Sequence, residues 1–105
     1  MFKNVGSQSW TFYERDYSTG APKTGDSANI VPYVSLDDAA AVAVAATPTE
    51  IDATHLPGWY NVVLAVGETN GTKLLLGAKS STANTECRGE VLWTKVDSRP
   101  VISGH

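Results

Sequence analysis

Short runs of β-branched and aromatic residues, separated by Gly, Pro, Asn, Asp and Ser, recur along the whole of this 105-residue chain. No stretch sustains the apolar spacing of a helix over a dozen positions. Strands are predicted at residues 9–15, 30–36, 39–46, 49–53, 59–64, 73–79 and 86–96. Connections roughly every eight to twelve residues over such a length are typical of a sandwich or small barrel. We therefore predict an all-β, antiparallel β-sandwich of about seven strands.

The length allows one domain and is too short for two ordinary ones. Few apolar residues precede Ser9 or follow Asp97. We predict an N-terminal arm at residues 1–8, the sandwich at 9–96 and a C-terminal tail at 97–105.

Two of the predicted strands carry conflicting signals. Alanine dominates residues 39–46 and favours helix, whereas Val42 and Val44 alternate as in a strand. We predict a strand there, with a short helix as the alternative. Pro32 lies inside the predicted strand 30–36 and has no N–H for a ladder, which indicates an edge strand or a bulge.

Turn residues separate the strands in the second half of the chain. Pro57-Gly58 is predicted to form a turn before the strand at 59–64. Asn70-Gly71 is predicted to be the tip of a hairpin, because both residues tolerate positive φ. The strand at 73–79 is apolar on both faces at Leu74, Leu75 and Leu76, which favours a central position.

The charge pattern argues against binding to nucleic acid. The net charge is −3 and the eight Lys and Arg residues are scattered singly, whereas phosphate binding needs a basic patch. No nucleic-acid partner is predicted.

Neither secretion nor a membrane is predicted. The first residues contain no apolar signal region, and the longest weakly apolar run, residues 39–46, is too short to cross a bilayer. The single Cys87 cannot form an internal disulfide. We interpret it as a strand residue of a protein made in a reducing compartment, with a reactive thiol as the lesser alternative.

Candidate catalytic residues are few. The chain has two histidines, His55 and His105. A Ser–His–Asp set could combine His55 with Asp52 or Asp38, but no Gly-x-Ser-x-Gly motif is present to display the serine. We predict that the protein is not an enzyme, with no catalytic residue, and that His55 is a polar loop residue.

No metal ion or other cofactor is predicted. Asp37 and Asp38 would point to opposite sides of an extended chain, so a turn-capping role is favoured. Glu50 and Asp52 share a strand face and could hold a cation, but this segment lacks the six to eight oxygens that calcium usually recruits.

The three tryptophans, Trp10, Trp59 and Trp93, leave three roles open. Large aromatic residues fill the cores of small β domains, anchor protein interfaces or stack against sugars. Burial in the core is the favoured interpretation.

Turn motifs resemble those of tailed-bacteriophage virion proteins. The resemblance lies in TGAPKTGDSANI at 19–30, SLD at 35–37, PTEIDAT at 48–54, PGWY at 57–60, ETN at 68–70 and SSTAN at 80–84. These motifs appear in the same order as in that group and span roughly residues 16–96. Such turn motifs indicate a fold family more specifically than they indicate a function.

The resemblance implies an immunoglobulin-like fold or a jelly-roll-like variant. The position of Tyr60 is similar to the tyrosine corner, in which a tyrosine at a strand start bonds back to a loop backbone. One departure concerns the strand order, because two strands are predicted after Tyr60 where a standard immunoglobulin domain has one.

The same resemblance implies a function in a virion. Related domains occur in tail, baseplate and fibre proteins and as free-standing capsid accessory proteins. We expect a non-enzymatic capsid decoration (cement) or head-fibre protein, made in the host cytoplasm. It would bind the major capsid protein and copies of itself, as a trimer or other homo-oligomer, and its arms would order on docking. The alternatives are a tail or baseplate component and a carbohydrate- or receptor-binding module.

Overall fold

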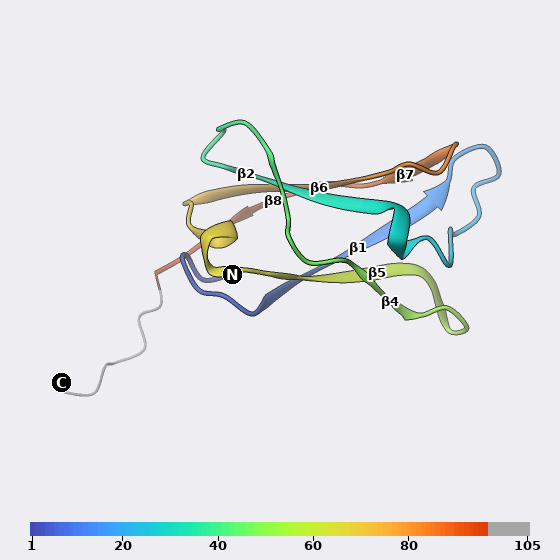
Figure 1. Cartoon of the computed structure of the whole chain (residues 1–105), viewed down its shortest axis with the longest axis horizontal. Helices are drawn as coiled ribbons and strands as arrows, with labels where there is room; N and C mark the ends of the chain where they lie inside the picture. Colours follow the sequence, from blue (N-terminus) through green and yellow to red (C-terminus); the bar gives the residue numbers. More distant parts are fainter. Residues whose placement is uncertain (97–105) are drawn as a thin grey trace.

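A computed structural model describes residues 1–96 as two packed antiparallel sheets (Figure 1). The strands are β1 (Gln8–Asp16), β2 (Ile30–Leu36), β3 (Val42–Ala43), β4 (Thr49–Asp52), β5 (Leu56–Leu64), β6 (Lys73–Ser80), β7 (Thr85–Cys87) and β8 (Glu90–Trp93), with short 3-10 helices η1 (Ser27–Asn29) and η2 (Val66–Thr69). The first sheet has the order β4-β5-β1-β7 and the second β3-β2-β6-β8. The predicted all-β, antiparallel sandwich is confirmed.

Alternating burial along the strands creates the space between the sheets. In β1 the side chains of Trp10, Phe12 and Glu14 are buried and the residues between them are not. β5 pairs with β1 in one continuous register from Gln8↔Leu64 to Tyr13↔Trp59. The two-residue period of a strand therefore assigns one side of each sheet to the core and the other to solvent.

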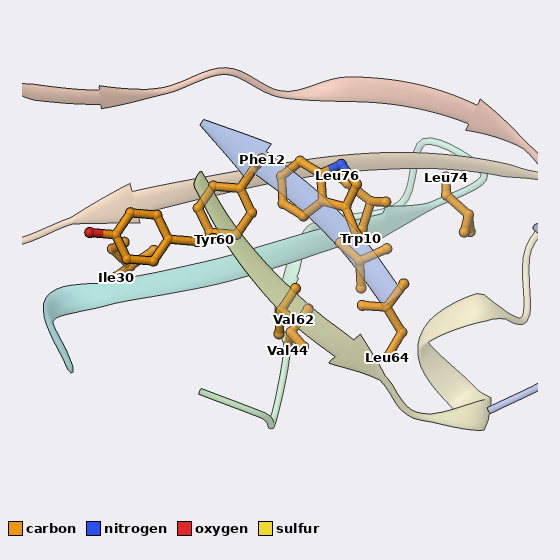
Figure 2. Close-up of a cluster of buried hydrophobic side chains, with 10 residues drawn as sticks. Trp10, Phe12, Ile30, Val44, Tyr60, Val62, Leu64, Leu74 and Leu76 are labelled. Atoms are coloured by element: carbon orange, nitrogen blue, oxygen red, sulfur yellow. The ribbon is translucent and has the colours of Figure 1, made fainter. Parts of the chain in front are cut away.

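The core contains ten buried apolar residues from both sheets (Figure 2). These are Trp10, Phe12, Tyr60, Val62 and Leu64 from the first sheet, Ile30, Val34, Leu74 and Leu76 from the second, and Val44 just after β3. The rings of Trp10 and Phe12 stack with centroids 4.7 Å apart, and Phe12 stacks on Tyr60 at 5.9 Å. Aromatic stacking thus runs along the inner face of β1 and onto β5.

The predicted last strand, residues 86–96, is wrong as a single element. β7 pairs with β1 in the first sheet, and β8 pairs with β6 in the second, so the chain crosses between the sheets at Arg88 and Gly89. A Cβ atom at position 89 would lie 2.7 Å from the backbone oxygen of Leu76, which explains the glycine at the crossing. The described residues therefore form eight strands, where about seven were predicted.

Most of the alanine-rich segment 39–46 is neither strand nor helix. Only Val42–Ala43 pairs with β2, and Val44 follows as the buried residue of the segment. The alanines offer too little apolar surface to hold a longer ladder.

Pro32 was predicted to mark an edge or a bulge, but β2 lies between β3 and β6 and pairs with β6 without a register break. The Pro32 oxygen accepts a hydrogen bond from the Val44 N–H, so the proline nitrogen also faces the β3 side. β3 has ended there, and the missing donor is therefore tolerated.

Two predicted turns take other forms. Pro57 and Gly58 lie within β5, where Gly58 adopts φ 85°. Asn70 and Gly71 are not a hairpin tip, because the flanking strands β5 and β6 belong to different sheets and neither residue has positive φ. Gly71 is instead buried against Leu36.

The segment predicted as an N-terminal arm is tied to the sandwich. Phe2 bridges Lys95, and the backbone of Val5 exchanges hydrogen bonds with the Thr69 hydroxyl. The Gln8 side chain binds the backbone of Phe2 on both its N–H and its C=O. Residues 1–7 thus close one end of the sandwich. The predicted C-terminal tail, 97–105, lies outside the described residues.

Candidate functional site

His55 lies at an exposed turn between β4 and β5. Its Nδ1 is 2.9 Å from the Asp52 carboxylate, whose other oxygen accepts the backbone N–H of His55. These two hydrogen bonds lower the pKa of Asp52. No Ser, Thr or Cys side chain bonds the His55 ring within residues 1–96. The Asp52–His55 pair closes this turn.

Two of the other carboxylates considered above, Glu50 and Asp37, accept backbone N–H groups, whereas Asp38 pairs with the Lys73 side chain. Glu50 accepts the N–H groups of Gly25 and Gly58, while a register shift separates it from Asp52. Asp37 accepts the N–H groups of Thr72 and Lys73, so it binds the start of β6 and not the backbone of its own turn, where a turn-capping role was predicted. In the part of the chain that the structure describes, no three His, Cys, Asp or Glu side chains are grouped to hold a metal ion.

A buried polar cluster joins β1 to the η1 loop and to the end of β6. Glu14 is fully buried and Asp26 is 2% exposed. Asp26 accepts hydrogen bonds from Asn29, Ser80 and Thr82. The cluster was not predicted from the sequence, although the inward position of Glu14, two residues after Phe12, is a visible signal for it.

The two carboxyl groups of this cluster have opposite pKa shifts. Burial raises the pKa of Glu14 to about 8, and the neighbouring Asp26 adds to the shift. Burial alone would raise the pKa of Asp26, but hydrogen bonds from Glu14, Ser80 and Thr82 lower it to about 2. Among residues 1–96, neither side-chain oxygen of Glu14 has a hydrogen-bond partner that would stabilise its ionised form. At neutral pH Glu14 is therefore protonated and Asp26 is charged.

Tyr60 and Cys87 complete the surroundings of this cluster. The Tyr60 hydroxyl donates to the Lys23 oxygen at 2.8 Å and accepts the Asp26 N–H. The tyrosine thus bonds to the backbone of the loop between β1 and η1, but it lies in the middle of β5 and not at a strand start as in a tyrosine corner. Burial raises the pKa of Cys87 to about 12, so its thiol is not a thiolate nucleophile.

The outer face of the second sheet carries five exposed apolar side chains, which we call the apolar face. Its members are Val31, Tyr33, Leu75, Val91 and Trp93, exposed by between 37% and 66%. Leu75 is directly opposite Val91, and Tyr33 is opposite Gly77, which adds no side chain. On a monomer, an apolar patch of a few hundred Å² commonly marks an interaction site.

Two lysines, one of them paired with an aspartate, lie at the apolar face. Lys73 lies opposite Trp93, with its Nζ 6.0 Å from the indole ring, and it pairs with Asp38 at 2.9 Å. Lys79 lies opposite Val31 and has no ion-pair partner within residues 1–96. The face therefore combines apolar contact area with positive charge at its margin.

The outer face of the first sheet is more polar. Thr11 is opposite Asn61, and their side chains are joined by a hydrogen bond of 3.1 Å. The rings of Tyr13 and Trp59 form a tilted pair with centroids 5.1 Å apart, and Arg15 pairs with Glu86 at 2.6 Å. The two faces of the sandwich thus present different chemistry.

The three tryptophans divide between the core and these faces. Trp10 is buried and its Nε1–H donates to Glu90, which links the two sheets. Trp59 is 40% exposed on the first sheet and Trp93 is 66% exposed on the second, so core burial is wrong for these two. Strand alternation gives the signal for Trp59, because its neighbour Tyr60 faces inward.

Comparison of the chain with protein-family models, with curated proteins and with solved structures finds no match. None of the helices formed by residues 1–96 has the length and apolar character needed to span a membrane. Any functional assignment therefore depends on the sequence motifs and on the surfaces described above.

Proposed function

We propose that this chain is a non-enzymatic structural protein of a tailed-bacteriophage virion, a capsid decoration or head-fibre protein that docks on the major capsid protein. The observation that carries this proposal is the apolar face, where five large apolar side chains are exposed on the outer side of one sheet. The turn motifs at residues 19–30 and 48–60 supply the link to virion proteins. Buried apolar area at many repeated contacts would hold such a protein on a shell through avidity.

The charge of the apolar face indicates the kind of surface that covers it. Lys73 and Lys79 lie on this face, and β2 has no acidic residue. Lys73 is paired with Asp38, so Lys79 carries the uncompensated positive charge of this face among the described residues, and a second copy meeting it through the same face would supply no carboxylate for Lys79. A capsid surface with apolar residues and carboxylates at its rim is the complementary partner, and a contact of about 800 Å² per partner would be of standard size.

Co-sedimentation with empty, expanded phage heads tests this proposal. We expect saturable binding of the wild type at a fixed ratio to the major capsid protein. The double variant Leu75→Ser with Val91→Ser removes apolar area at the centre of the apolar face and should weaken binding by about tenfold or more. Val63→Ser is the matched control, because Val63 is 49% exposed on the opposite sheet.

The outcomes separate the alternatives. Equal binding of the double variant and the control would show that another surface docks. Absence of binding to heads by the wild type would contradict the decoration role. Binding to isolated tails instead would assign the protein to a tail or baseplate.

The Tyr13–Trp59 pair favours a second candidate function, a carbohydrate-binding module. Aromatic rings offer an apolar platform for a sugar ring, and Asn61 and Arg15 nearby can bond its hydroxyl groups. A glycan array with Trp59→Ala and Trp93→Ala tests it. Specific binding lost only in Trp59→Ala would support this function, and the absence of any glycan signal for the wild type would exclude it.

A further inference from the structure

One edge of the central strand β1 is open. β5 pairs with β1 over residues 8–13, whereas β7 covers the other edge only at Glu14–Asp16. Within residues 1–96, no strand pairs with residues 9–13 on that second edge. The gap arises because the chain crosses to the second sheet after β7.

The main-chain groups of Thr11 point toward this open edge. The backbone oxygen of Glu14 accepts a hydrogen bond from the backbone N–H of Lys23, which lies on the side of β1 opposite β7. Successive residues of a strand direct their N–H and C=O groups to alternate sides. The β1–β5 register is continuous, so this alternation is not interrupted. The N–H and C=O groups that point to the open edge are therefore those of Ser9, Thr11 and Tyr13.

A recess lies along this edge, which we call the edge recess. Its volume is about 290 Å³, and it is lined by residues 10–13, Trp59 and residues 88–90. A flat edge of another sandwich fits poorly into a hollow, whereas one extended segment can enter it. Strand addition of this kind uses main-chain hydrogen bonds for affinity and a side-chain pocket for specificity.

Residues 9–13 themselves lack the usual protection against strand addition, although Arg88 and Glu90 line the recess beside them. Exposed edges commonly carry charges, prolines or bulges. Residues 9–13 (SWTFY) contain no charged residue and no proline, and they are rich in strand-forming side chains. The short outer strands differ, since β4 contains Glu50 and Asp52 and β7 contains Glu86.

We propose that the segment 97–105 of a second copy binds in the edge recess as an added strand next to Thr11. This segment contains one apolar pair, Val101-Ile102, and nine residues are more than enough to cover an edge of five. An isoleucine or valine side chain is of a size to enter the recess beside Trp59. If each copy donates this segment to the next copy, an oligomer forms. The oligomer is a closed ring where the rotation that relates neighbouring copies closes on itself.

The position of the last described residues favours donation to another copy. Lys95 bonds to Met1 and Lys3 at the end of the sandwich, and the edge recess lies level with Glu90. Five residues at about 3.3 Å each separate Lys95 from Glu90, so the segment 97–105 would have to turn back by about 16 Å to reach the edge recess of its own copy. A second copy requires no such reversal.

The test measures the mass of the full-length chain by light scattering, in the absence of phage heads, over about a hundredfold range of concentration. We expect the wild type to exceed the monomer mass of 11.1 kDa as concentration rises. Ile102→Asp should weaken association by about tenfold or more, because it places a charge in the recess. Ser98→Asp is the matched control, since it adds the same charge outside the apolar pair, and it should associate like the wild type.

Amide hydrogen exchange at Thr11 gives a second measurement. Its protection should rise with concentration in the wild type and not in Ile102→Asp. A monomer at every concentration would overturn the proposal, and so would protection of Thr11 that is independent of concentration, which indicates binding within one chain. Association lost in the Leu75→Ser with Val91→Ser variant but kept in Ile102→Asp would also overturn it, because copies would then meet through the apolar face.

This proposal does not depend on docking to a capsid. Binding to heads can fail while concentration-dependent association through 97–105 persists, and the reverse can also occur. The two experiments use different surfaces and different variants, so their failures are distinguishable.

Discussion

Leu75 and Leu76 are adjacent in β6, and their side chains point to opposite faces of the second sheet. Leu76 is fully buried in the core, whereas Leu75 is 48% exposed on the apolar face. The cost of losing a leucine depends on the contacts and the cavity left behind. These two residues therefore separate a contribution to stability from a contribution to binding.

We predict that Leu76→Ala lowers the free energy of unfolding by about 2–5 kcal/mol, the range for buried leucines. Leu75→Ala should lower it by about 1 kcal/mol or less, as is usual at exposed positions. Urea denaturation of the two variants measures this difference. Equal losses would contradict the assignment of the two faces.

Tyr60 contributes a second effect at the scale of one residue. Its hydroxyl holds the Lys23 oxygen and the Asp26 N–H. Tyr60→Phe keeps the ring stacking on Phe12 and leaves both backbone groups without this partner. We predict a loss of about 1–3 kcal/mol by thermal or urea denaturation. An unchanged free energy of unfolding would show that the loop is held by other contacts.

At the scale of elements, the crossing between β7 and β8 takes the chain from the first sheet to the second. Gly89 lies where the chain passes close to the backbone of Leu76. We predict that Gly89→Ala destabilises the fold by about 1–3 kcal/mol, because backbone atoms cannot move aside cheaply.

Gly77→Ala provides the control for the crossing. Gly77 lies next to Leu76 in β6, and a Cβ atom there meets nothing within 4 Å. Its change in unfolding free energy should stay within about 0.5 kcal/mol. Similar losses in both variants would mean that crowding at the crossing is not the cause.

The positions of the strands were easier to predict from the sequence than the way in which the strands pair. The apolar alternation of β1 and β5 lies in local sequence, and β2, from Ile30 to Leu36, has the bounds predicted for it. The break within residues 86–96 depends on which sheet each half joins, and only Gly89 hints at it. Asn70-Gly71 likewise has the composition of a hairpin, but the elements on its two sides pack into different sheets.

The candidate surfaces also depend on strand pairing, which the sequence does not show. The sequence shows that Val31, Leu75 and Trp93 are apolar, but cross-strand register alone brings them onto one face. The edge recess was also missed, because an open edge on β1 arises from the crossing after β7. Only sheet order reveals such sites.

At the scale of the whole molecule, the Glu14–Asp26 cluster couples stability to pH. The pKa of Glu14 is raised to about 8 in the folded protein. The folded state therefore keeps a proton that the unfolded state loses above about pH 4.5. This contribution is fully present below about pH 4.5 and is lost as the pH rises to about 8.

Asp26 acts in the opposite direction. Its pKa is lowered from 3.8 to about 2, so its contribution is present above pH 3.8 and is lost as the pH falls toward 2. The two effects together place the greatest stability near pH 4 to 5, with a decline on both sides.

We predict that the free energy of unfolding falls by a few kcal/mol between about pH 4.5 and 8, since one pKa unit corresponds to about 1.4 kcal/mol. Glu14→Gln should remove most of this decline, because glutamine cannot ionise and its amide can donate to Asp26. Urea denaturation at pH 4.5, 6 and 8 measures both proteins. A decline of the same size in Glu14→Gln would show that the buried carboxyl pair is not the source. A flat profile in the wild type would show that Glu14 ionises freely in the folded protein. Loss of the decline in Glu14→Gln alone would establish that one carboxyl group, buried where β1 meets the η1 loop, sets how the whole sandwich responds to pH.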